Sequence, residues 1–354
     1  MTSEKVLITG GLGYIGSHVC VEFLNADINV LVIDNLINCD LSVVEKIERI
    51  TCSKLNFIIG DIRDEDLLNK VFQENKISSV IHLAGLKAVG ESCETPIRYY
   101  DYNLIGTIAL LKSMNKHGCR HIVFSSSATV YGDPVFLPLT ENHQVDVKNP
   151  YGRSKLIIEN ILQDLHTSNP EWNYGILRYF NPIGAHNSGL LGESPQGVPN
   201  NLLPYITGVV YGNLNELEIF GDDYQTPDGT GVRDYIHVED LANAHLKILL
   251  RLSKLEPASR IINIGTGRGY SVLEIIKVFE KIANCKVPFK VSKRREGDVA
   301  SCFADVTLAK KVLDWQAEHS LESMISSICK WEENRVHTPQ PNDYKIKNKS
   351  RDCS

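Results

Sequence analysis

A glycine-rich turn near the amino terminus constrains the fold of this chain more than any other feature. An apolar run at residues 5–9 leads directly into Gly10, Gly13 and Gly16, and a helical stretch follows at 17–25. A strand, a tight turn and a helix in this order bring the backbone close to a pyrophosphate and point the helix amino end at it. The pattern therefore predicts a dinucleotide-binding βαβ unit.

An acidic residue after the second apolar run indicates which dinucleotide is bound. The run at 29–33 ends in Asp34, near the distance from the glycines at which a carboxylate accepts a hydrogen bond from a ribose 2′-hydroxyl. A carboxylate there repels a 2′-phosphate, and Asn35 offers no compensating cation. NAD is therefore favoured over NADP. The alternative is a structural glycine turn beside a solvated aspartate.

Strand-like and helical segments alternate through the first half of the chain. The strand-like runs are at 57–62, 80–85, 121–125 and 174–178, and the helical segments are near 64–75, 94–117 and 151–167. This alternation predicts an α/β fold with a doubly wound parallel sheet of the Rossmann type. Ligands of such sheets bind beyond the carboxyl ends of the strands, which is where Gly10, Asp34, Asp61, Gly85 and Ser127 fall.

The second half of the chain has a different pattern. After Asn181 it is irregular and rich in Gly, Pro and Asn to about residue 231, and strand-like runs return at 234–238 and 261–265. We expect an NAD-binding domain at 1–180, with sheet elements returning near 232–265, and a smaller, interwoven substrate domain at 181–335. Residues 336–354 are polar and are expected to form a disordered tail.

Composition excludes several classes of function. The chain has 354 residues and a net charge of −6, which argues against nucleic-acid binding. It contains no apolar segment long enough for a membrane span, and a polar tripeptide precedes the first strand, so no membrane association or signal peptide is expected. Nine cysteines without Cys-x-x-Cys spacing indicate reduced thiols in a cytoplasmic protein. Gly118 separates His117 from His121, so no metal site is predicted there or elsewhere.

Two residues four apart suggest acid–base chemistry. On a helix, Tyr151 and Lys155 share one face, so the ammonium group can stabilise a phenolate. Lowering a phenol pKa from ~10 to neutrality needs about 4 kcal/mol, which is what one charge at ~4 Å supplies at an effective dielectric of ~20. Ser127 precedes this pair, and it either hydrogen-bonds the reacting oxygen or caps a turn at the strand end.

Longer motifs carry a resemblance to a known family. The chain resembles the UDP-galactose 4-epimerases of the extended short-chain dehydrogenase/reductase family from Val6 to about Trp331. The most specific runs are Ala84-Gly-Leu-Lys-Ala-Val89 and Asp228-Gly-Thr-Gly-Val-Arg-Asp234. Less specific are the glycine motif, Ser125-Ser-Ser-Ala-Thr-Val-Tyr-Gly132, Tyr151-Gly-Arg-Ser-Lys155 and Arg178-Tyr-Phe-Asn-Pro182. Arg153 replaces a lysine that is common inside the Tyr-x-x-x-Lys motif, but it lies off the catalytic face.

The resemblance implies an activity. It is the reversible interconversion of UDP-galactose and UDP-glucose in galactose metabolism, with tightly bound NAD. Oxidation at C4 gives a 4-keto sugar, and hydride then returns to its opposite face. Tyr151 would take the proton of the 4-hydroxyl, Ser127 would hold the 4-oxygen, and Lys155 would hold the nicotinamide ribose.

The resemblance also implies two sets of binding residues. The cofactor set is Gly10, Gly13, Tyr14, Ile15, Gly16, Asp34, Asn35, Asp61, Ile62, Leu83, Ala84, Gly85, Lys87, Asn103, Tyr151, Lys155 and Tyr179. The substrate set is Lys87, Ser127, Tyr151, Asn181, Asn201, Leu202, Phe220, Arg233, Arg295, Asp298 and Cys302. Cys302 stands where relatives carry tyrosine or a smaller residue beside the sugar C2, so UDP-N-acetylglucosamine and UDP-N-acetylgalactosamine should also fit. Phe220 and Cys302 have an alternative interpretation as ordinary core residues.

Two other functions compete with epimerisation. A nucleotide-sugar 4,6-dehydratase shares the fold, NAD and the Tyr-x-x-x-Lys motif, but it needs an acidic pair where this chain has Ala128 and Thr129. An NAD-binding sensor without catalysis would not need Ser127, Tyr151 and Lys155 together. The family commonly forms homodimers through the helices near 94–117 and 151–167, and we expect the same here.

Overall fold

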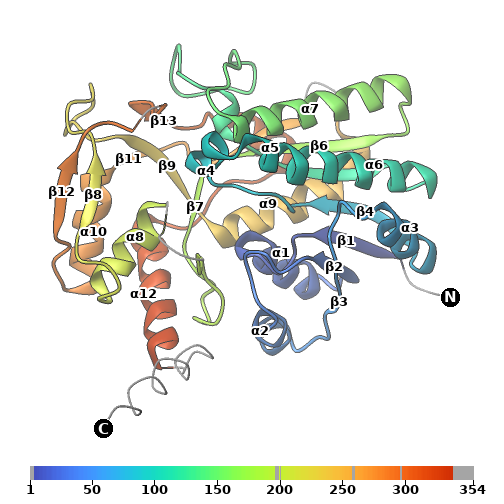
Figure 1. Ribbon diagram of the computed structural model, residues 1–354, viewed down its shortest axis with the longest axis horizontal. Helices are drawn as coiled ribbons and strands as arrows, with labels where there is room; N and C mark the ends of the chain where they lie inside the picture. The colour runs from blue at the N-terminus through green and yellow to red at the C-terminus, as the bar shows by residue number, and fades with distance from the viewer. Residues whose placement is uncertain (1–3, 196–198, 200, 257–259, 296, 338–354) are drawn as a thin grey trace, which may run out of the picture.

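The computed structural model of the protein describes residues 4–195, 199, 201–256, 260–295 and 297–337. Its largest element is a parallel sheet of seven strands in the order β10-β6-β5-β4-β1-β2-β3 (Figure 1). The strands are β1 Lys5–Thr9, β2 Val30–Asp34, β3 Asn56–Ile59, β4 Ile77–His82, β5 His121–Ser127, β6 Asn173–Tyr179 and β10 Ile261–Ile264. The predicted doubly wound parallel sheet is confirmed.

Helices cover both faces of this sheet, which explains why its central strands are almost continuously apolar. One face packs against α1 Tyr14–Asn25, α2 Ser42–Thr51, α9 Val238–Arg251 and α11 Thr307–Leu313. The other face packs against α3 Glu65–Glu74, α6 Gly106–Lys116 and α7 Pro150–Ser168. The two faces form two separate apolar cores.

The segment expected as one helix near 94–117 is divided. It consists of α4 Val89–Glu94, α5 Pro96–Tyr99, a π-helical turn Tyr100–Ile105, and α6. Pro96 occupies the first turn of α5, where its missing N–H is not needed, and therefore separates α5 from α4. A 3₁₀ turn, Ala128–Val130, follows β5, and another, Leu252–Lys254, follows α9.

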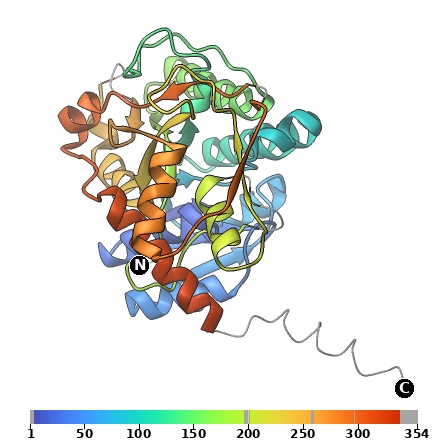
Figure 2. The same ribbon diagram turned by 90° about the vertical axis from the view of Figure 1, so that its left-hand side faces the viewer.

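A smaller part of the molecule lies to the left in Figure 1. It has a four-stranded sheet of β7 Asn181–Ile183, β9 Val232–His237, β11 Gly269–Ser271 and β13 Ser301–Cys302, and a pair of β8 Leu217–Phe220 with β12 Phe289–Ser292. Helices α8 Leu202–Val210, α10 Val272–Ala283 and α12 Leu321–His337 complete a third core, and Figure 2 shows α10 beside α12.

The two strands expected to return after residue 231 divide between the two parts. β10 joins the edge of the large sheet by pairing with β6, whereas β9 pairs with β7, β11 and β13. Residues 336 and 337 of the expected tail belong to α12, and the rest of that tail lies outside the described residues.

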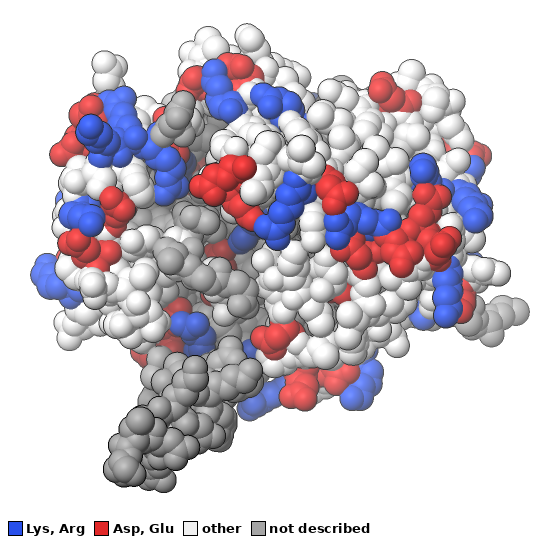
Figure 3. Space-filling model, viewed as in Figure 1, with Lys and Arg blue, Asp and Glu red and all other residues white. Residues whose placement is uncertain are grey.

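Two surface features bear on function. On the face shown in Figure 3, acidic and basic side chains are interspersed over the described residues. None of the helices within the described ranges is long and apolar enough to cross a membrane.

Candidate functional site

The glycine turn is crowded by backbone on two sides. Gly10 has a φ of +70°, and a Cβ there would lie 2.8 Å from the Ala84 nitrogen. A Cβ on Gly16 would lie 2.1 Å from the Gly10 carbonyl oxygen. Gly13 is the N-cap residue of α1 and has no side chain to cover the helix end. The turn therefore excludes side chains and leaves the amino end of α1 suited to an anion.

Asp34 lies at the carboxyl end of β2 and braces this turn. Its carboxylate accepts hydrogen bonds from the Leu12 N–H at 3.0 Å and the Leu36 N–H at 2.9 Å. The carboxylate is therefore fixed beside the glycines, where the ribose of the adenosine is predicted to bind.

The neighbouring polar residues form a second group. Asn35 donates to the Asp61 carboxylate at 2.9 Å. Hydrogen bonds from Arg63 lower the pKa of Asp61 to about 2. The Arg63 guanidinium also pairs with Asp101 and lies 3.7 Å from the centre of the Tyr102 ring. Sequence reasoning missed Arg63, whose position follows no recognisable motif.

Asn103 holds the loop after β4 against helix α7. Its side chain accepts from the Leu86 N–H at 2.7 Å and donates to the Leu86 carbonyl at 3.1 Å. It also donates to the Ser154 hydroxyl at 3.1 Å. Gly85 lies so close that a Cβ there would be 3.0 Å from the Asn103 side-chain oxygen. Asn103 thus shapes the loop that carries Leu83, Ala84 and Gly85.

Ser127, Tyr151 and Lys155 meet at the carboxyl edge of the large sheet. Ser127 ends β5, and α7 begins at Pro150, with Asn149 capping its first turn. The Ser127 hydroxyl lies near enough to the Tyr151 phenol to lower the pKa of the phenol. Ser127 also accepts from the Thr129 N–H at 3.2 Å and from the Thr129 hydroxyl at 3.0 Å, so it caps the turn beside the phenol.

A backbone carbonyl of β5 holds the Lys155 side chain in place. Only 6% of it is exposed, and its ammonium donates to the Ser125 carbonyl at 2.7 Å. The ammonium lies 5.8 Å from the centre of the Tyr151 ring. A buried ion pair supports the same region, because Glu159 on α7 accepts from Ser126 and binds Arg178 of β6 at 2.6 Å.

The pKa values differ from the expectation that Lys155 brings the phenol toward neutrality. Burial raises the pKa of Tyr151, and the hydrogen bond with Ser127 offsets this only in part. Burial also lowers the pKa of Lys155 to about 8. The physical reason is that both groups lose solvation, while the ammonium is directed at the Ser125 carbonyl.

Tyr179 lies next to this group at the end of β6. It is buried, and its hydroxyl hydrogen-bonds to His245 of α9. Burial raises the pKa of Tyr179 well above its usual value, and Tyr151 contributes to the shift. Tyr179 is therefore a neutral neighbour of the Ser127–Tyr151 pair.

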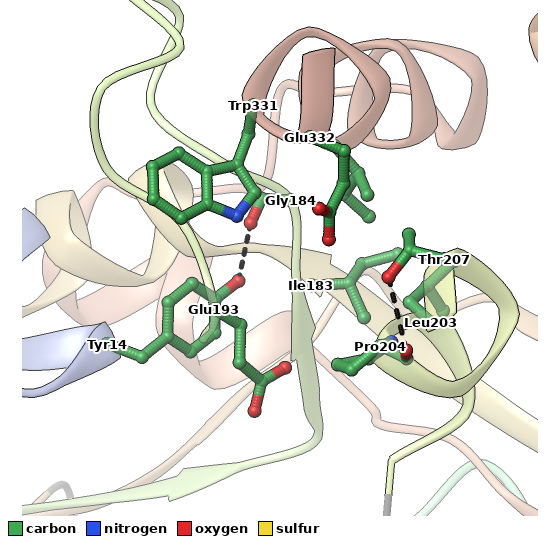
Figure 4. A pocket seen from close by; sticks show the side chains of 10 residues that line it. Tyr14, Ile183, Gly184, Glu193, Leu203, Pro204, Thr207, Trp331 and Glu332 are labelled. Atoms are coloured by element: carbon green, nitrogen blue, oxygen red, sulfur yellow. Dashed lines mark hydrogen bonds between the residues drawn. The ribbon is translucent and has the colours of Figure 1, made fainter. Parts of the chain in front are cut away.

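Two residues from the predicted sets meet at an unpredicted carboxylate. Glu193 accepts from Lys87 at 2.6 Å and from Asn201 at 3.0 Å. Figure 4 shows Glu193 near Tyr14, whose hydroxyl donates to the Gly184 carbonyl at 2.7 Å. Glu193 lies in an irregular segment that carries no motif, so the sequence provided no signal for it.

The remaining predicted substrate residues lie in the smaller part. The Arg295 guanidinium stacks 4.3 Å from the centre of the Phe220 ring, and Arg233 lies 3.8 Å from the Asp298 carboxylate. Cys302 of β13 pairs with Arg233 of β9 and packs against a small apolar cluster. Asn181 begins β7, Asn201 is the N-cap residue of α8, and Leu202 is its first residue.

Comparison with known proteins identifies the family to which the chain belongs. A model described as "NAD dependent epimerase/dehydratase family" matches residues 6–265. The chain belongs to this family.

Several named proteins and solved structures are similar to this chain. The UDP-glucose 4-epimerase of Bacillus subtilis is 50% identical over 94% of this chain and 98% of its own. The structure of UDP-glucose 4-epimerase from Bifidobacterium longum, in complex with NAD⁺ and UDP, is 49% identical over 94% of this chain and 99% of its own, with a TM-score of 0.90. The UDP-Glc/GlcNAc 4-epimerase of Campylobacter jejuni is 34% identical over 94% and 100%, with a TM-score of 0.81.

Proposed function

We propose that this protein is an NAD-dependent UDP-glucose 4-epimerase that interconverts UDP-galactose and UDP-glucose. The observation that carries the proposal is the grouping of Ser127, Tyr151 and Lys155 at the same sheet edge as the glycine turn. The similarity to UDP-glucose 4-epimerases extends over almost the whole chain, so it includes both halves of such a site.

The residues around the glycine turn fit NAD. The side-chain-free turn and the amino end of α1 suit its pyrophosphate, and the fixed Asp34 carboxylate suits a ribose with a free 2′-hydroxyl. The remaining cofactor residues are those of the predicted set, with Asp61 and Ile62 at the adenine. When bound, NAD accepts hydride from the sugar C4 and returns it, and its cationic nicotinamide favours the phenolate form of Tyr151.

The protein supplies proton transfer at the sugar 4-oxygen. Tyr151 takes the proton of the 4-hydroxyl, and the same phenol returns it when the configuration has inverted. Ser127 lies beside the phenol, whose pKa it lowers, and steadies the 4-oxygen. Lys155, held by the Ser125 carbonyl, places positive charge on the phenol's face of α7. No proton is gained or lost over the cycle, as an isomerisation requires.

Inversion requires the nucleotide to be held while the sugar turns. Arg233 and Arg295 carry planar cations suited to a diphosphate, and Phe220 offers a ring face to the uracil. Asn181, Asn201, Leu202 and Asp298 complete the grip, and Lys87 reaches the boundary between cofactor and substrate. On this proposal residues 1–180 mainly hold NAD and residues 181–335 mainly hold the nucleotide sugar.

Cys302 extends the proposed substrate range to UDP-N-acetylglucosamine and UDP-N-acetylgalactosamine. Cys302 stands in register with Arg233 and its side chain is small, so on this proposal it leaves space that a tyrosine would fill. The Campylobacter jejuni relative is named for both UDP-Glc and GlcNAc, which supports a site of this breadth.

A homodimer and a cytoplasmic location belong to the same proposal. Ile97 is 81% exposed and Ile105 is 50% exposed, and both lie on the helical run that the family uses for dimerisation. The eight cysteines that the structure describes are free thiols, as a reducing compartment would keep them.

One incubation tests the proposed function. The purified enzyme, given UDP-galactose without added NAD, should produce UDP-glucose and approach a constant ratio of the two. Acid extraction of the fresh protein should release NAD. A 4-keto-6-deoxy product would identify a dehydratase, and NAD release without turnover would identify an NAD-binding protein that lacks catalysis.

A further inference from the structure

A buried histidine lies at the start of the two loops that the cofactor residues occupy. His82 is the last residue of β4 and stands in register with Thr9, the last residue of β1. It is 1% exposed, and the predicted cofactor residues at 83–85 follow it directly. Gly10 follows Thr9 in the same way. The loop after β4 and the glycine turn therefore begin from two paired residues.

Both nitrogens of the His82 ring are bonded to buried threonines. Nδ1 lies 2.7 Å from the Thr9 hydroxyl, and Nε2 lies 2.8 Å from the Thr107 hydroxyl. Thr107 is in the first turn of α6, directly after the π-helical turn that carries Asn103. The imidazole thus joins the ends of β1 and β4 to the start of α6.

The neighbouring groups determine where each proton lies. The Thr107 hydroxyl lies 2.5 Å from the Asn103 backbone carbonyl and donates its own proton there. It must therefore accept from Nε2 of His82, so Nε2 carries the ring proton. The Thr9 hydroxyl accepts the Ala84 N–H at 3.3 Å, and its own proton points to Nδ1 of His82. One chain of hydrogen bonds therefore runs from the Ala84 N–H to the Asn103 carbonyl.

The surroundings keep this imidazole neutral. Burial and the nearby charge of Lys155 lower the pKa of His82 to about 3. The centre of the Phe124 ring lies 5.7 Å from the centre of the His82 ring and 4.9 Å from the Lys155 ammonium. The other neutral tautomer would set the Nε2 lone pair against the Thr107 oxygen, with no proton between them. The ring is therefore held in one protonation state and one tautomer.

The chain of hydrogen bonds reaches two sides of the proposed NAD site. At one end, the Ala84 nitrogen lies so close to the glycine turn that a Cβ on Gly10 would be 2.8 Å from it. At the other end, the Asn103 side chain donates to Ser154 of α7, the helix that carries the proposed acid–base residues. His82 is therefore placed to set the separation between the glycine turn, the loop after β4 and α7.

We propose that His82 is a positioning residue that holds the loop after β4 where NAD binding requires it, acting through Thr9 and Thr107. This inference rests on the proposed NAD-dependent function. The competing explanation is that the imidazole only fills space in the core. In that case another ring of similar size would serve as well.

His82→Phe separates these explanations, because it keeps a buried ring and removes both hydrogen bonds. The variant is dialysed at a temperature at which its melting curve shows it folded, and the remaining NAD is measured by acid extraction. It should lose NAD about 10-fold faster than the wild type, or more, as expected for the loss of one or two hydrogen bonds. Added NAD should restore turnover of UDP-galactose. The affinity for UDP, measured by calorimetry, should be unchanged, because the smaller part of the molecule is proposed to bind it.

Nitrogen NMR of histidine-labelled protein tests the tautomer itself. The wild type should show a ring signal that the His82→Phe variant lacks, with the proton on Nε2 and no change between pH 8 and pH 5, because the pKa of His82 is about 3. A proton on Nδ1, or titration of this signal within that range, would contradict the hydrogen-bond chain.

Further variants separate a local effect from a general loss of stability. His121→Phe replaces a half-buried histidine at the opposite end of the neighbouring strand β5 and should retain NAD as the wild type does. Thr107→Val breaks one link of the chain, so it should also speed NAD loss, and it should add little to His82→Phe.

Wild-type NAD retention in both His82→Phe and Thr107→Val would overturn the proposal. So would equally fast NAD loss in His121→Phe, or a matching loss of UDP affinity in His82→Phe. A wild-type protein that yields no NAD on acid extraction would instead contradict the proposed function on which this inference rests.

Discussion

At the scale of single residues, the chemistry of this site depends on how strongly burial disfavours the charged forms of its side chains. The Tyr151 phenol and the Lys155 ammonium are both removed from water, and each is shifted away from its charged form. The Ser127 hydroxyl lowers the pKa of the phenol, whereas the Lys155 ammonium lies 5.8 Å from the centre of the phenol ring and donates to the Ser125 carbonyl. Ser127 therefore has a larger part in preparing the phenol than the Tyr-x-x-x-Lys spacing suggests.

Removing the Tyr151 hydroxyl should stop catalysis without disturbing the fold. Tyr151→Phe keeps the ring against α7 but eliminates the proton carrier, so turnover of UDP-galactose should fall by ~10²–10⁴-fold. Acid-extractable NAD should be unchanged. Tyr211→Phe, which removes a hydroxyl bonded to the Cys329 carbonyl, is the matched control and should retain activity. Near-normal turnover in Tyr151→Phe would refute the assignment.

Enlarging Cys302 should narrow the substrate range. Cys302 stands in register with Arg233 and packs against a small apolar cluster, and a tyrosine ring there would occupy the space proposed for an N-acetyl group. Cys302→Tyr should abolish interconversion of the two UDP-N-acetyl sugars while UDP-galactose is still converted. Cys302→Ser, which keeps the size, should retain both activities. Equal loss of both in Cys302→Tyr would instead mean that Cys302 is only a packing residue.

At the scale of elements, the site depends on side chains that fasten one segment to another. Asn103 joins the π-helical turn to the loop after β4 and to α7, and the Glu159–Arg178 pair joins α7 to β6. These contacts explain how loops at the carboxyl edge of the sheet keep a fixed shape. They link residues far apart in sequence, so no local sequence pattern predicts them.

Replacing Asn103 tests whether its hydrogen bonds hold the loop after β4 in place. Asn103→Ala leaves the buried N–H and carbonyl of Leu86 without their partners, at about 1–3 kcal/mol for each unsatisfied group. Urea unfolding should show a loss of stability of that order, and NAD should be lost more readily on dialysis. Asn115→Ala, at an exposed position of α6, should change neither quantity. Unaltered stability in Asn103→Ala would show that the loop is held by other contacts.

At the scale of the whole molecule, the large sheet was far easier to predict than its neighbours. Short apolar runs between helical segments fixed six of its strands near their observed positions, because a strand covered on both faces must be apolar throughout. The returning strands were harder, since β9 and β10 pair in different sheets with strands far away in the chain. Pairing at long sequence separation also hid Arg63 and Glu193.

Buried histidines should make the stability of the whole molecule depend on pH. Burial lowers the pKa of His82 to about 3 and that of His245 to about 4. In the unfolded chain both imidazoles titrate near 6.5, so the unfolded state takes up protons first as the pH falls. Stability is therefore fully present above pH 6.5 and is lost progressively as the pH falls toward 4. Each histidine contributes about 1.4 kcal/mol per pH unit within this window.

His245→Gln isolates one of these contributions. The free energy of unfolding in urea is measured for wild type and variant at pH 6.5 and at pH 5.0, and the change between the two pH values is compared. The wild type should lose about 1.6 kcal/mol more than the variant over this interval, because the variant lacks one imidazole that the unfolded state protonates. Asn103→Ala is destabilised but keeps every histidine, so it should lose as much as the wild type. Equal losses in wild type and His245→Gln would mean that burial does not hold this imidazole neutral in the folded protein.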